Sequence, residues 1–382
     1  MKKVLSTIVS FLKIIRRRLK IIFVRIQPSL IAVLMGLIAG VIMMLIFNPS
    51  ETLNGIRNLM FGVIYRNNQL NLRGIYTTLH HSTTIILTGI AVVFAFRTGL
   101  FNIGASGQMM VAAYVTVHIG VLWTLPSPIH WMVAIIFGTL TGMLYGLIPG
   151  VLKALRNVNE VVTSIMLNWI AASLIVFLVN RNVLNTFTQG GSRNIASTAI
   201  IPRIFSQYQL TIGIFIAIAM GILAHFILYK TTLGFQLRAS GFNMDGSKYA
   251  GMNTKRNVIL SMGISGAFAG LAGALLFLNY GKTLSTEVHV FMEGFEGISV
   301  ALLGLGEPIG AIIAGIFLSY IKQGGFYMQP AFRPEISDMI IGVIIYFTAI
   351  SVALQLILKK HSKTIKEFFR KKKRIEIKED QS

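Results

Sequence analysis

The stretch VILSMGISGAFAGLAGALLFLN, residues 258–279, decides the fold of this chain. It carries no charged side chain, and it is long enough to cross the hydrocarbon core of a bilayer, which takes about 20 apolar residues. Gly266 and Gly270 lie four residues apart and therefore share one helix face. Small residues at this spacing mark the faces on which helices pack in lipid. We therefore predict that this segment is a transmembrane helix packed closely against a neighbour.

Nine further apolar segments accompany it along the chain. The ten segments are 30–47, 79–96, 102–122, 131–151, 160–179, 210–229, 258–279, 288–305, 308–321 and 338–358. Hydrophobic residues make up 54% of the chain and charged residues 13%, whereas soluble domains carry roughly 25% charge. We predict an all-α polytopic membrane helix bundle with about ten transmembrane helices.

The formal charge of +22 has two possible meanings, nucleic-acid binding or membrane topology. No Lys or Arg falls inside the ten segments. With the N-terminus inside, the inner connections carry 26 of the 35 Lys and Arg residues. This bias predicts cytoplasmic termini and no nucleic-acid partner.

The same topology divides the chain into regions. Residues 1–29 form a basic cytoplasmic arm, 30–358 the transmembrane domain and 359–382 a basic tail beside anionic membrane lipid. Residues 180–209 are expected to form an extracytoplasmic loop and 230–257 a cytoplasmic loop.

Glycine patterns predict how the helices pack. Gly138, Gly142, Gly146 and Gly150 recur every fourth residue and form a second packing face. A weak repeat is also visible, since Gly-Ile-Ala-Val at 89–92 resembles Gly-Ile-Ser-Val at 297–300. Residues 103–105 and 309–311 share Ile-Gly-Ala. Two weakly similar halves are a frequent construction of transporters.

Polar side chains at membrane depth form three groups. The groups are Asn102, Ser106 and Gln108; Asn159, Glu160, Thr163, Ser164 and Asn168; and Glu293, Glu296 and Ser299. Polar groups are costly in a bilayer and usually line a cavity or pair with a neighbouring helix. The sequence leaves both interpretations open, solute contact or helix capping and interhelical hydrogen bonds.

Catalytic chemistry has little support in the sequence. The chain contains no cysteine, and we find no zinc-protease or nucleophile-elbow motif. Gly281-Lys282-Thr283 resembles the end of a phosphate-binding loop, but Leu276 stands where its first glycine belongs. We therefore expect no enzyme activity and no cofactor bound by this chain, with energy supplied by a partner or by an ion gradient.

The cytoplasmic loop 230–257 carries a recognisable local signal. Asn243 is suited to cap a short helix over 244–249, and Gly251 is suited to end it. A small helix of this kind can dock into a groove of another protein. An ordinary solvated loop is the alternative.

Four stretches together identify a resemblance. They are 101–108 (FNIGASGQ), 159–170 (NEVVTSIMLNWI), 233–251 (LGFQLRASGFNMDGSKYAG) and 294–304 (GFEGISVALLG). The chain resembles permease subunits of the branched-chain amino acid, ribose and simple-sugar ABC importer superfamily, and most closely its nucleoside and simple-sugar branch. That family usually has Glu at the position of Ser106 and Asp at the position of Glu296. The loss of charge at Ser106 weakens the family's usual role at that position.

The resemblance implies a transport assembly in a bacterial plasma membrane. A cytoplasmic ABC ATPase subunit would use ATP and Mg²⁺, a second and different permease subunit would complete the pathway, and an extracytoplasmic solute-binding lipoprotein would deliver a nucleoside or, second, a simple sugar. The pathway residues would be Asn102, Gln108, Asn159, Glu160, Asn168, Glu296 and Ser299. The ATPase-coupling residues would be Gly234, Arg238, Gly241, Asn243, Tyr249 and Gly251.

Two other classes of function remain as alternatives. A secondary transporter driven by an ion gradient would use a membrane-embedded carboxylate, for which Glu160 or Glu296 could serve. A membrane enzyme would need a paired catalytic constellation, which the sequence does not show. Uptake that continues after ATP depletion, with the gradient kept, would identify the secondary transporter.

Overall fold

The long helices account for most of the fold. The computed structural model describes residues 30–349 except 32, 67–68, 182–184, 187–189, 280 and 330, so the predicted arm 1–29 and tail 359–382 lie outside it. Among the described residues, seven helices are long and apolar enough to cross a membrane: α3 (Leu72–Arg97), α4 (Ala105–Leu122), α5 (Ile129–Arg156), α6 (Glu160–Arg181), α7 (Gly213–Lys230), α10 (Thr254–Phe277) and α12 (Pro308–Tyr327). The prediction of an all-α polytopic membrane protein is confirmed.

Three of the ten predicted spans correspond to helices with fewer than 18 described residues, and one of them, Pro334–Ala349, reaches the last described residue. These are Val33–Phe47, α11 (Met292–Leu303) and α13 (Pro334–Ala349). The 12 residues of α11 give a length of about 18 Å, which is less than the hydrocarbon thickness of about 30 Å. The first four residues of the predicted segment 288–305 are not helical, and the helix begins at Met292. The number of membrane crossings stays a prediction.

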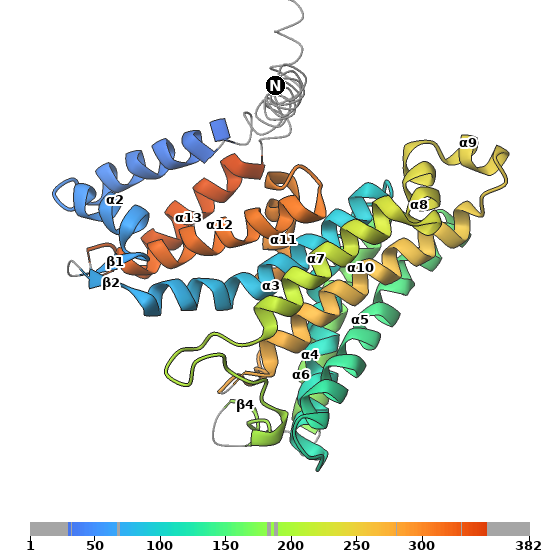
Figure 1. Ribbon diagram of the computed structural model, residues 1–382, viewed down its shortest axis with the longest axis horizontal. Helices are drawn as coiled ribbons and strands as arrows, with labels where there is room; N and C mark the ends of the chain where they lie inside the picture. The colour runs from blue at the N-terminus through green and yellow to red at the C-terminus, as the bar shows by residue number, and fades with distance from the viewer. Residues whose placement is uncertain are drawn as a thin grey trace, which may run out of the picture.

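Several small elements lie in the connections. Those that the sequence analysis did not predict are α2 (Thr52–Phe61), the antiparallel pairs β1 (Tyr65–Arg66) with β2 (Gln69–Leu70) and β3 (Asn185–Thr186) with β4 (Gly191–Ser192), the 3-10 turn η1 (Ser197–Ala199) and α8 (Thr232–Phe242). The short helix predicted over 244–249 is confirmed as α9 (Met244–Tyr249). Figure 1 shows α8 and α9 together at one end of the bundle, with the β4 region at the opposite end.

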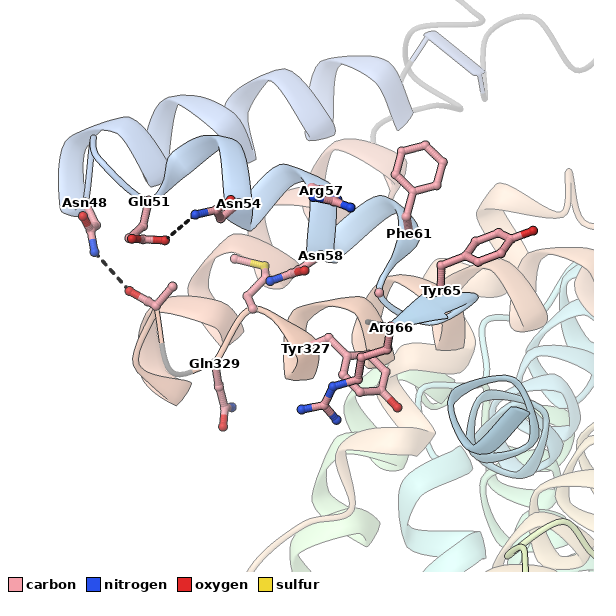
Figure 2. Close-up of a pocket in the computed structure, with 13 residues that line it drawn as sticks. Asn48, Glu51, Asn54, Arg57, Asn58, Phe61, Tyr65, Arg66, Tyr327 and Gln329 are labelled. Atoms are coloured by element: carbon pink, nitrogen blue, oxygen red, sulfur yellow. Dashed lines mark hydrogen bonds between the residues drawn. The ribbon is translucent and has the colours of Figure 1, made fainter. Parts of the chain in front are cut away.

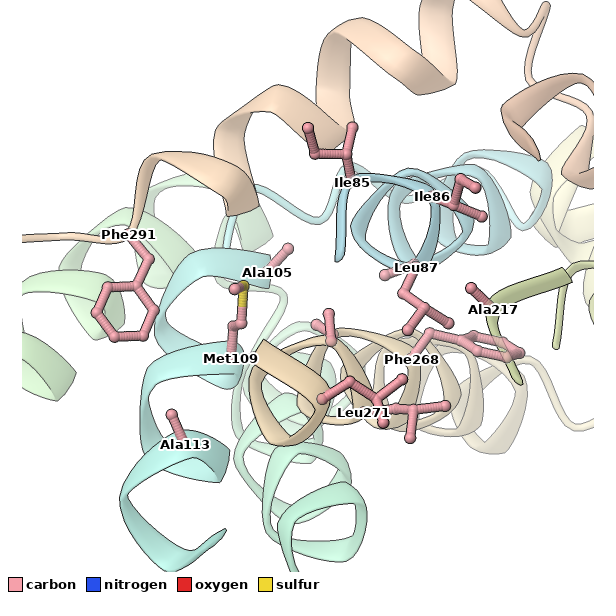
Figure 3. Close-up of a cluster of buried hydrophobic side chains, with 14 of the residues drawn as sticks. Ile85, Ile86, Leu87, Ala105, Met109, Ala113, Ala217, Phe268, Leu271 and Phe291 are labelled. Carbon is pink, nitrogen blue, oxygen red and sulfur yellow. The ribbon is translucent and has the colours of Figure 1, made fainter. Parts of the chain in front are cut away.

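Helices α3 and α10 form the centre of the bundle. In the most apolar 18-residue stretch of each of these two helices, 78% is buried inside the protein, whereas only 22% of the corresponding stretch of α5 is buried. Leu87 of α3 points toward Phe268 of α10, within a buried cluster that also includes Met109 of α4 (Figure 3). The peripheral helices instead leave large apolar side chains exposed, as expected for a surface that faces lipid.

The glycine stripes predicted from sequence pack against each other. A Cβ atom on Gly142 of α5 would lie 2.7 Å from the Gly266 carbonyl oxygen of α10, and one on Gly146 would lie 2.9 Å from the Gly266 Cα. Gly142 also meets the backbone of Gly270. Only glycine allows the two backbones to approach this closely, so the predicted packing faces are confirmed.

The two similar stretches 89–92 and 297–300 lie against each other. Gly89 of α3 contacts Val300 of α11, and a Cβ on Gly297 would lie 2.6 Å from the Thr88 carbonyl carbon. The matching segments therefore share one close helix contact. A duplication of the two halves stays a prediction.

Candidate functional site

The first turns of α4 and α11 meet inside the bundle. Ser106 Oγ donates a hydrogen bond of 2.5 Å to the Phe291 carbonyl oxygen. A Cβ on Gly294 would lie 2.5 Å from the Ser106 nitrogen, so only glycine fits at that position. Two stretches that lie far apart in the sequence and carry predicted pathway residues thus come together.

The amides of Asn102 and Gln108 are paired within this interior. Asn102 Nδ2 donates to Gln108 Oε1 at 2.9 Å and to Ser265 Oγ at 2.7 Å. Ser265 Oγ in turn donates to the Ala91 carbonyl oxygen at 2.6 Å. The Asn102 side chain is fully buried and that of Gln108 almost so, so these bonds tie the start of α4 to α10 and α3.

Asn168 plays a similar part on α6. Its Oδ1 accepts from the Gly107 nitrogen at 2.8 Å, and its Nδ2 donates to the Ile103 carbonyl oxygen at 3.1 Å. In this conformation Asn102, Gln108 and Asn168 make the interhelical hydrogen bonds that the sequence left open as an alternative. Contact with a solute would require these bonds to open, and their pathway role stays a prediction.

Asn159 and Glu160 lie apart from this interior cluster. They begin α6, eight residues before Asn168, which places Glu160 about 12 Å from it along the helix axis. Asn159 Oδ1 caps the helix by accepting from the Val161 nitrogen at 2.9 Å. Glu160 Oε2 pairs with Lys153 Nζ of α5 at 3.0 Å. Both side chains therefore have a local structural role at the end of the helix that the topology places inside.

Of the two carboxylate oxygens of Glu296 on α11, one accepts a hydrogen bond and the other has no donor among the described residues. Oε1 accepts from Lys322 Nζ of α12 at 2.6 Å. Oε2 is buried, and none of the described residues donates a hydrogen bond to it. Ser299 lies one turn further along α11 and is 9% exposed. Among the seven predicted pathway residues, Glu296 is the one with a buried side-chain oxygen that lacks a hydrogen-bond donor in the described part of the chain.

The predicted coupling residues form one compact element, α8 with α9. Arg238 Nε donates to the Leu228 carbonyl oxygen at 2.9 Å, and its guanidinium lies 4.7 Å from the centre of the Tyr229 ring. Asn243 Oδ1 accepts from the Gly246 nitrogen at 2.8 Å and so caps α9, as predicted. Gly251, with φ of +78°, follows the helix in the left-handed region that favours glycine.

The α8–α9 element packs tightly against the ends of α3 and α7 on one side, and its other side is exposed. A Cβ on Gly234 would lie 2.5 Å from the Leu228 oxygen, and one on Gly241 would lie 2.6 Å from the Gly99 nitrogen. The Phe242 side chain is nevertheless 95% exposed and that of Tyr249 94%. Aromatic side chains of this kind are typical anchors of protein interfaces, and sequence reasoning missed Phe242.

A polar pocket of 1040 Å³ lies at another part of the molecule, between α2 and the end of α12 (Figure 2). Its amide and aromatic lining residues are Asn48, Asn54, Asn58, Gln329, Phe61, Tyr65 and Tyr327. Arg66 lies over the Tyr327 ring at 5.5 Å. The topology predicted from charge places this pocket on the extracytoplasmic side.

A second pocket of 700 Å³ continues from the first along α3. Arg73, Thr77 and His81 line it from positions four residues apart, and Gln323 and Gln209 line it from elsewhere. Sequence reasoning did not single out either pocket. The cluster of asparagines between residues 48 and 58 was the available signal.

Comparison with known proteins identifies the family. Residues 74–349 match the family described as the branched-chain amino acid transport system permease component. The chain belongs to this family. All four stretches on which the resemblance rested lie within the matched range, so that identification is confirmed.

Several relatives of this permease are ABC transporter subunits. The chain is 37% identical to the guanosine ABC transporter permease protein NupP of Bacillus subtilis, over 87% of this chain and 96% of the relative. It is 33% identical to the nucleoside ABC transporter permease protein NupB of Lactococcus lactis, over 90% and 95%. It is 27% identical to the glucose ABC transporter permease protein TsgB13 of Haloferax volcanii, over 71% and 74%. No solved structure matches this permease.

Proposed function

We propose that this permease is the membrane-spanning subunit of an ATP-driven importer that carries a nucleoside, with a simple sugar as the second candidate. The α8–α9 element carries the proposal, because it is seated on the ends of the membrane helices and presents Phe242 and Tyr249 outward. An element of this shape suits a separate ATPase that binds ATP and Mg²⁺. A second permease subunit, a solute-binding lipoprotein and a bacterial plasma membrane complete the proposed assembly.

The amide and aromatic groups of the outer pockets suit a solute with several hydrogen-bonding groups and a flat face, and the charged side chains of Glu51, Arg57, Arg66 and Arg73 line the same pockets. Amide side chains such as Asn58 and Gln329 both donate and accept, and aromatic rings such as Tyr327 can stack on a base or a sugar face. The nucleoside and guanosine permeases among the relatives favour a nucleoside. The glucose permease keeps the sugar as the second candidate.

The proposed mechanism is alternating access. Closure of the ATPase dimer would move α8 and α9, and the two permease subunits would rock around the pathway between them. We assign the solute contacts to Glu296 and Ser299 first, because Glu296 has a free buried oxygen. Asn102, Gln108 and Asn168 would contribute only when their internal bonds open, and Asn159 and Glu160 would flank the inner exit.

Uptake by the reconstituted importer tests this proposal. The full complex in proteoliposomes, with the receptor outside and ATP inside, should accumulate radiolabelled guanosine faster than glucose. Replacement of ATP by a non-hydrolysable analogue should stop uptake even with an imposed proton or sodium gradient. Gradient-driven uptake without ATP would instead support the secondary transporter.

A further inference from the structure

A chain of polar contacts joins helix ends around the α8–α9 element. Arg97, the last residue of α3, forms an ion pair with Glu307, which precedes the first residue of α12. The other carboxylate oxygen of Glu307, Oε2, accepts from the Tyr229 hydroxyl at 2.7 Å. Tyr229 lies near the end of α7, and its ring stacks under Arg238 of α8.

The contacts close into a ring. Beyond Arg97, the chain turns at Gly99, and a Cβ on Gly99 would lie 2.7 Å from the Gly241 Cα of α8. We call the set Arg97, Glu307, Tyr229 and Arg238, closed by the Gly99–Gly241 contact, the inner ring. The inner ring connects four helices, α3, α7, α8 and α12, and includes the most characteristic residues of the predicted coupling loop.

Arg97 also holds the turn that joins α11 to α12. Its Nε donates to the Gly306 carbonyl oxygen at 2.6 Å. Leu305 and Gly306 have φ angles of +60° and +64°, and a leucine in the left-handed region is held there against its own preference. The turn directly follows α11, which carries Glu296 and Ser299.

We propose that Arg97, Glu307 and Tyr229 are positioning residues that transmit displacement of α8 to α11 and the start of α12. The inference rests on the proposed function as an ATP-driven permease. Arg97 and Glu307 side chains are 33% and 37% exposed, and ion pairs of that exposure add little to folding stability. Their value is geometric, because two donors of one guanidinium fix the turn and the carboxylate together.

The test measures solute transported per ATP hydrolysed by the complete reconstituted complex. Tyr229→Phe removes only the hydroxyl and keeps the ring under Arg238, and Glu307→Gln removes the charge at nearly constant size. We expect ATP hydrolysis to stay within about twofold of wild type while guanosine uptake per ATP falls about tenfold, the scale of one lost charge-assisted hydrogen bond. The double variant should be no worse than the more impaired single variant, because both changes break the same connection.

Tyr145→Phe is the matched control. The Tyr145 hydroxyl donates to the Leu167 carbonyl oxygen at 2.8 Å, so the change removes a comparable hydrogen bond that joins α5 and α6, outside the inner ring. Its uptake per ATP should equal that of wild type. Arg97→Lys provides a second variant that keeps the charge but lacks the planar pair of donors, and it should also lower uptake per ATP.

The outcomes separate this inference from the proposed function. Wild-type uptake per ATP in Tyr229→Phe, Glu307→Gln and Arg97→Lys would overturn the inference about the inner ring. A parallel loss of ATP hydrolysis and uptake, with reduced assembly of the complex, would also overturn that inference. A wild-type complex that shows no ATP-dependent uptake of guanosine or glucose would contradict the proposed function itself.

Discussion

Gly99 and Gly241 lie in backbone contact, although 142 positions separate them in the sequence. A Cβ on Gly241 would lie 2.6 Å from the Gly99 nitrogen and 2.7 Å from the Thr98 oxygen. The contact fixes α8 against the end of the central helix α3. The coupling element is therefore built onto the core of the bundle, and a side chain at this position would push it away.

Gly241→Ala should displace the α8–α9 element from the end of α3 while leaving the permease in the membrane. The added methyl meets backbone atoms that cannot rotate away, and overpacking of this kind costs about 1–3 kcal/mol. We expect solute uptake and solute-stimulated ATP hydrolysis to fall together by at least about tenfold, with normal membrane yield. Gly342→Ala is the control, because no atom lies within 4 Å of a Cβ built at that exposed position of α13.

The exposed aromatics of the coupling element should bind the ATPase. Phe242 is 95% exposed, so Phe242→Ala should leave the thermal stability of the isolated permease unchanged. Loss of an interface anchor typically costs about 2 kcal/mol or more, so co-purification of the ATPase subunit should fall by more than about tenfold. Phe215→Ala, at a 63% exposed position of α7, should retain the ATPase, and an equal loss in that control would contradict the docking role.

The absence of cysteine allows a direct test of topology. Tyr249→Cys and Leu53→Cys would each introduce one thiol, at positions that are 94% and 79% exposed. In intact cells a membrane-impermeant maleimide should label Leu53→Cys only, and Tyr249→Cys should react only after permeabilisation. Labelling of Tyr249→Cys from outside would place α9 on the wrong side for a cytoplasmic ATPase.

Periodic signals allowed much of the fold to be predicted from the sequence. The glycines of residues 138–150 and 258–279 marked the α5–α10 contact because their spacing repeats along a single helix. Asn243 and Gly251 marked the ends of α9 because capping is a local interaction. These features depend on residues that are close in the chain.

The ion pairs and interior hydrogen bonds depend instead on contacts over long sequence distances. Glu307 meets Arg97 and Tyr229 from 210 and 78 positions away, and nothing near Glu307 in the sequence indicates either partner. For the same reason, sequence alone could not decide whether Asn102 and Gln108 contact solute or each other. The polar residues were identifiable as unusual at membrane depth, but their partners required the three-dimensional arrangement.

Asn168→Ala should destabilise the permease. The substitution leaves the Gly107 nitrogen and the Ile103 carbonyl oxygen without their partner in a buried site, at a cost of about 1–3 kcal/mol for each unsatisfied group. We expect a lower midpoint of thermal unfolding in detergent together with reduced uptake. Asn54→Ala, at an exposed position in α2, should change the unfolding free energy by less than about 0.5 kcal/mol. Reduced uptake with an unchanged midpoint for Asn168→Ala would favour direct solute contact instead.

Removing Lys322 should be more damaging than neutralising Glu296. Lys322→Met leaves the carboxylate of Glu296, a side chain only 13% exposed, without its cation, and breaking a buried pair from one side costs about 3–5 kcal/mol. The cost here should lie at the lower end, because the Lys322 side chain is 39% exposed. Glu296→Gln keeps the shape, removes the charge and leaves an amide that can still bind a neutral solute.

The double variant Glu296→Gln with Lys322→Met completes the comparison. It contains neither an uncompensated carboxylate nor an uncompensated ammonium, so it should unfold at a higher temperature than Lys322→Met alone. If Glu296 contacts the solute through its free oxygen, guanosine uptake by Glu296→Gln should show a raised KM at nearly unchanged assembly. ATP-dependent uptake that keeps the wild-type KM and kcat in Glu296→Gln would remove Glu296 from the pathway and leave the ion pair as a purely structural link between α11 and α12.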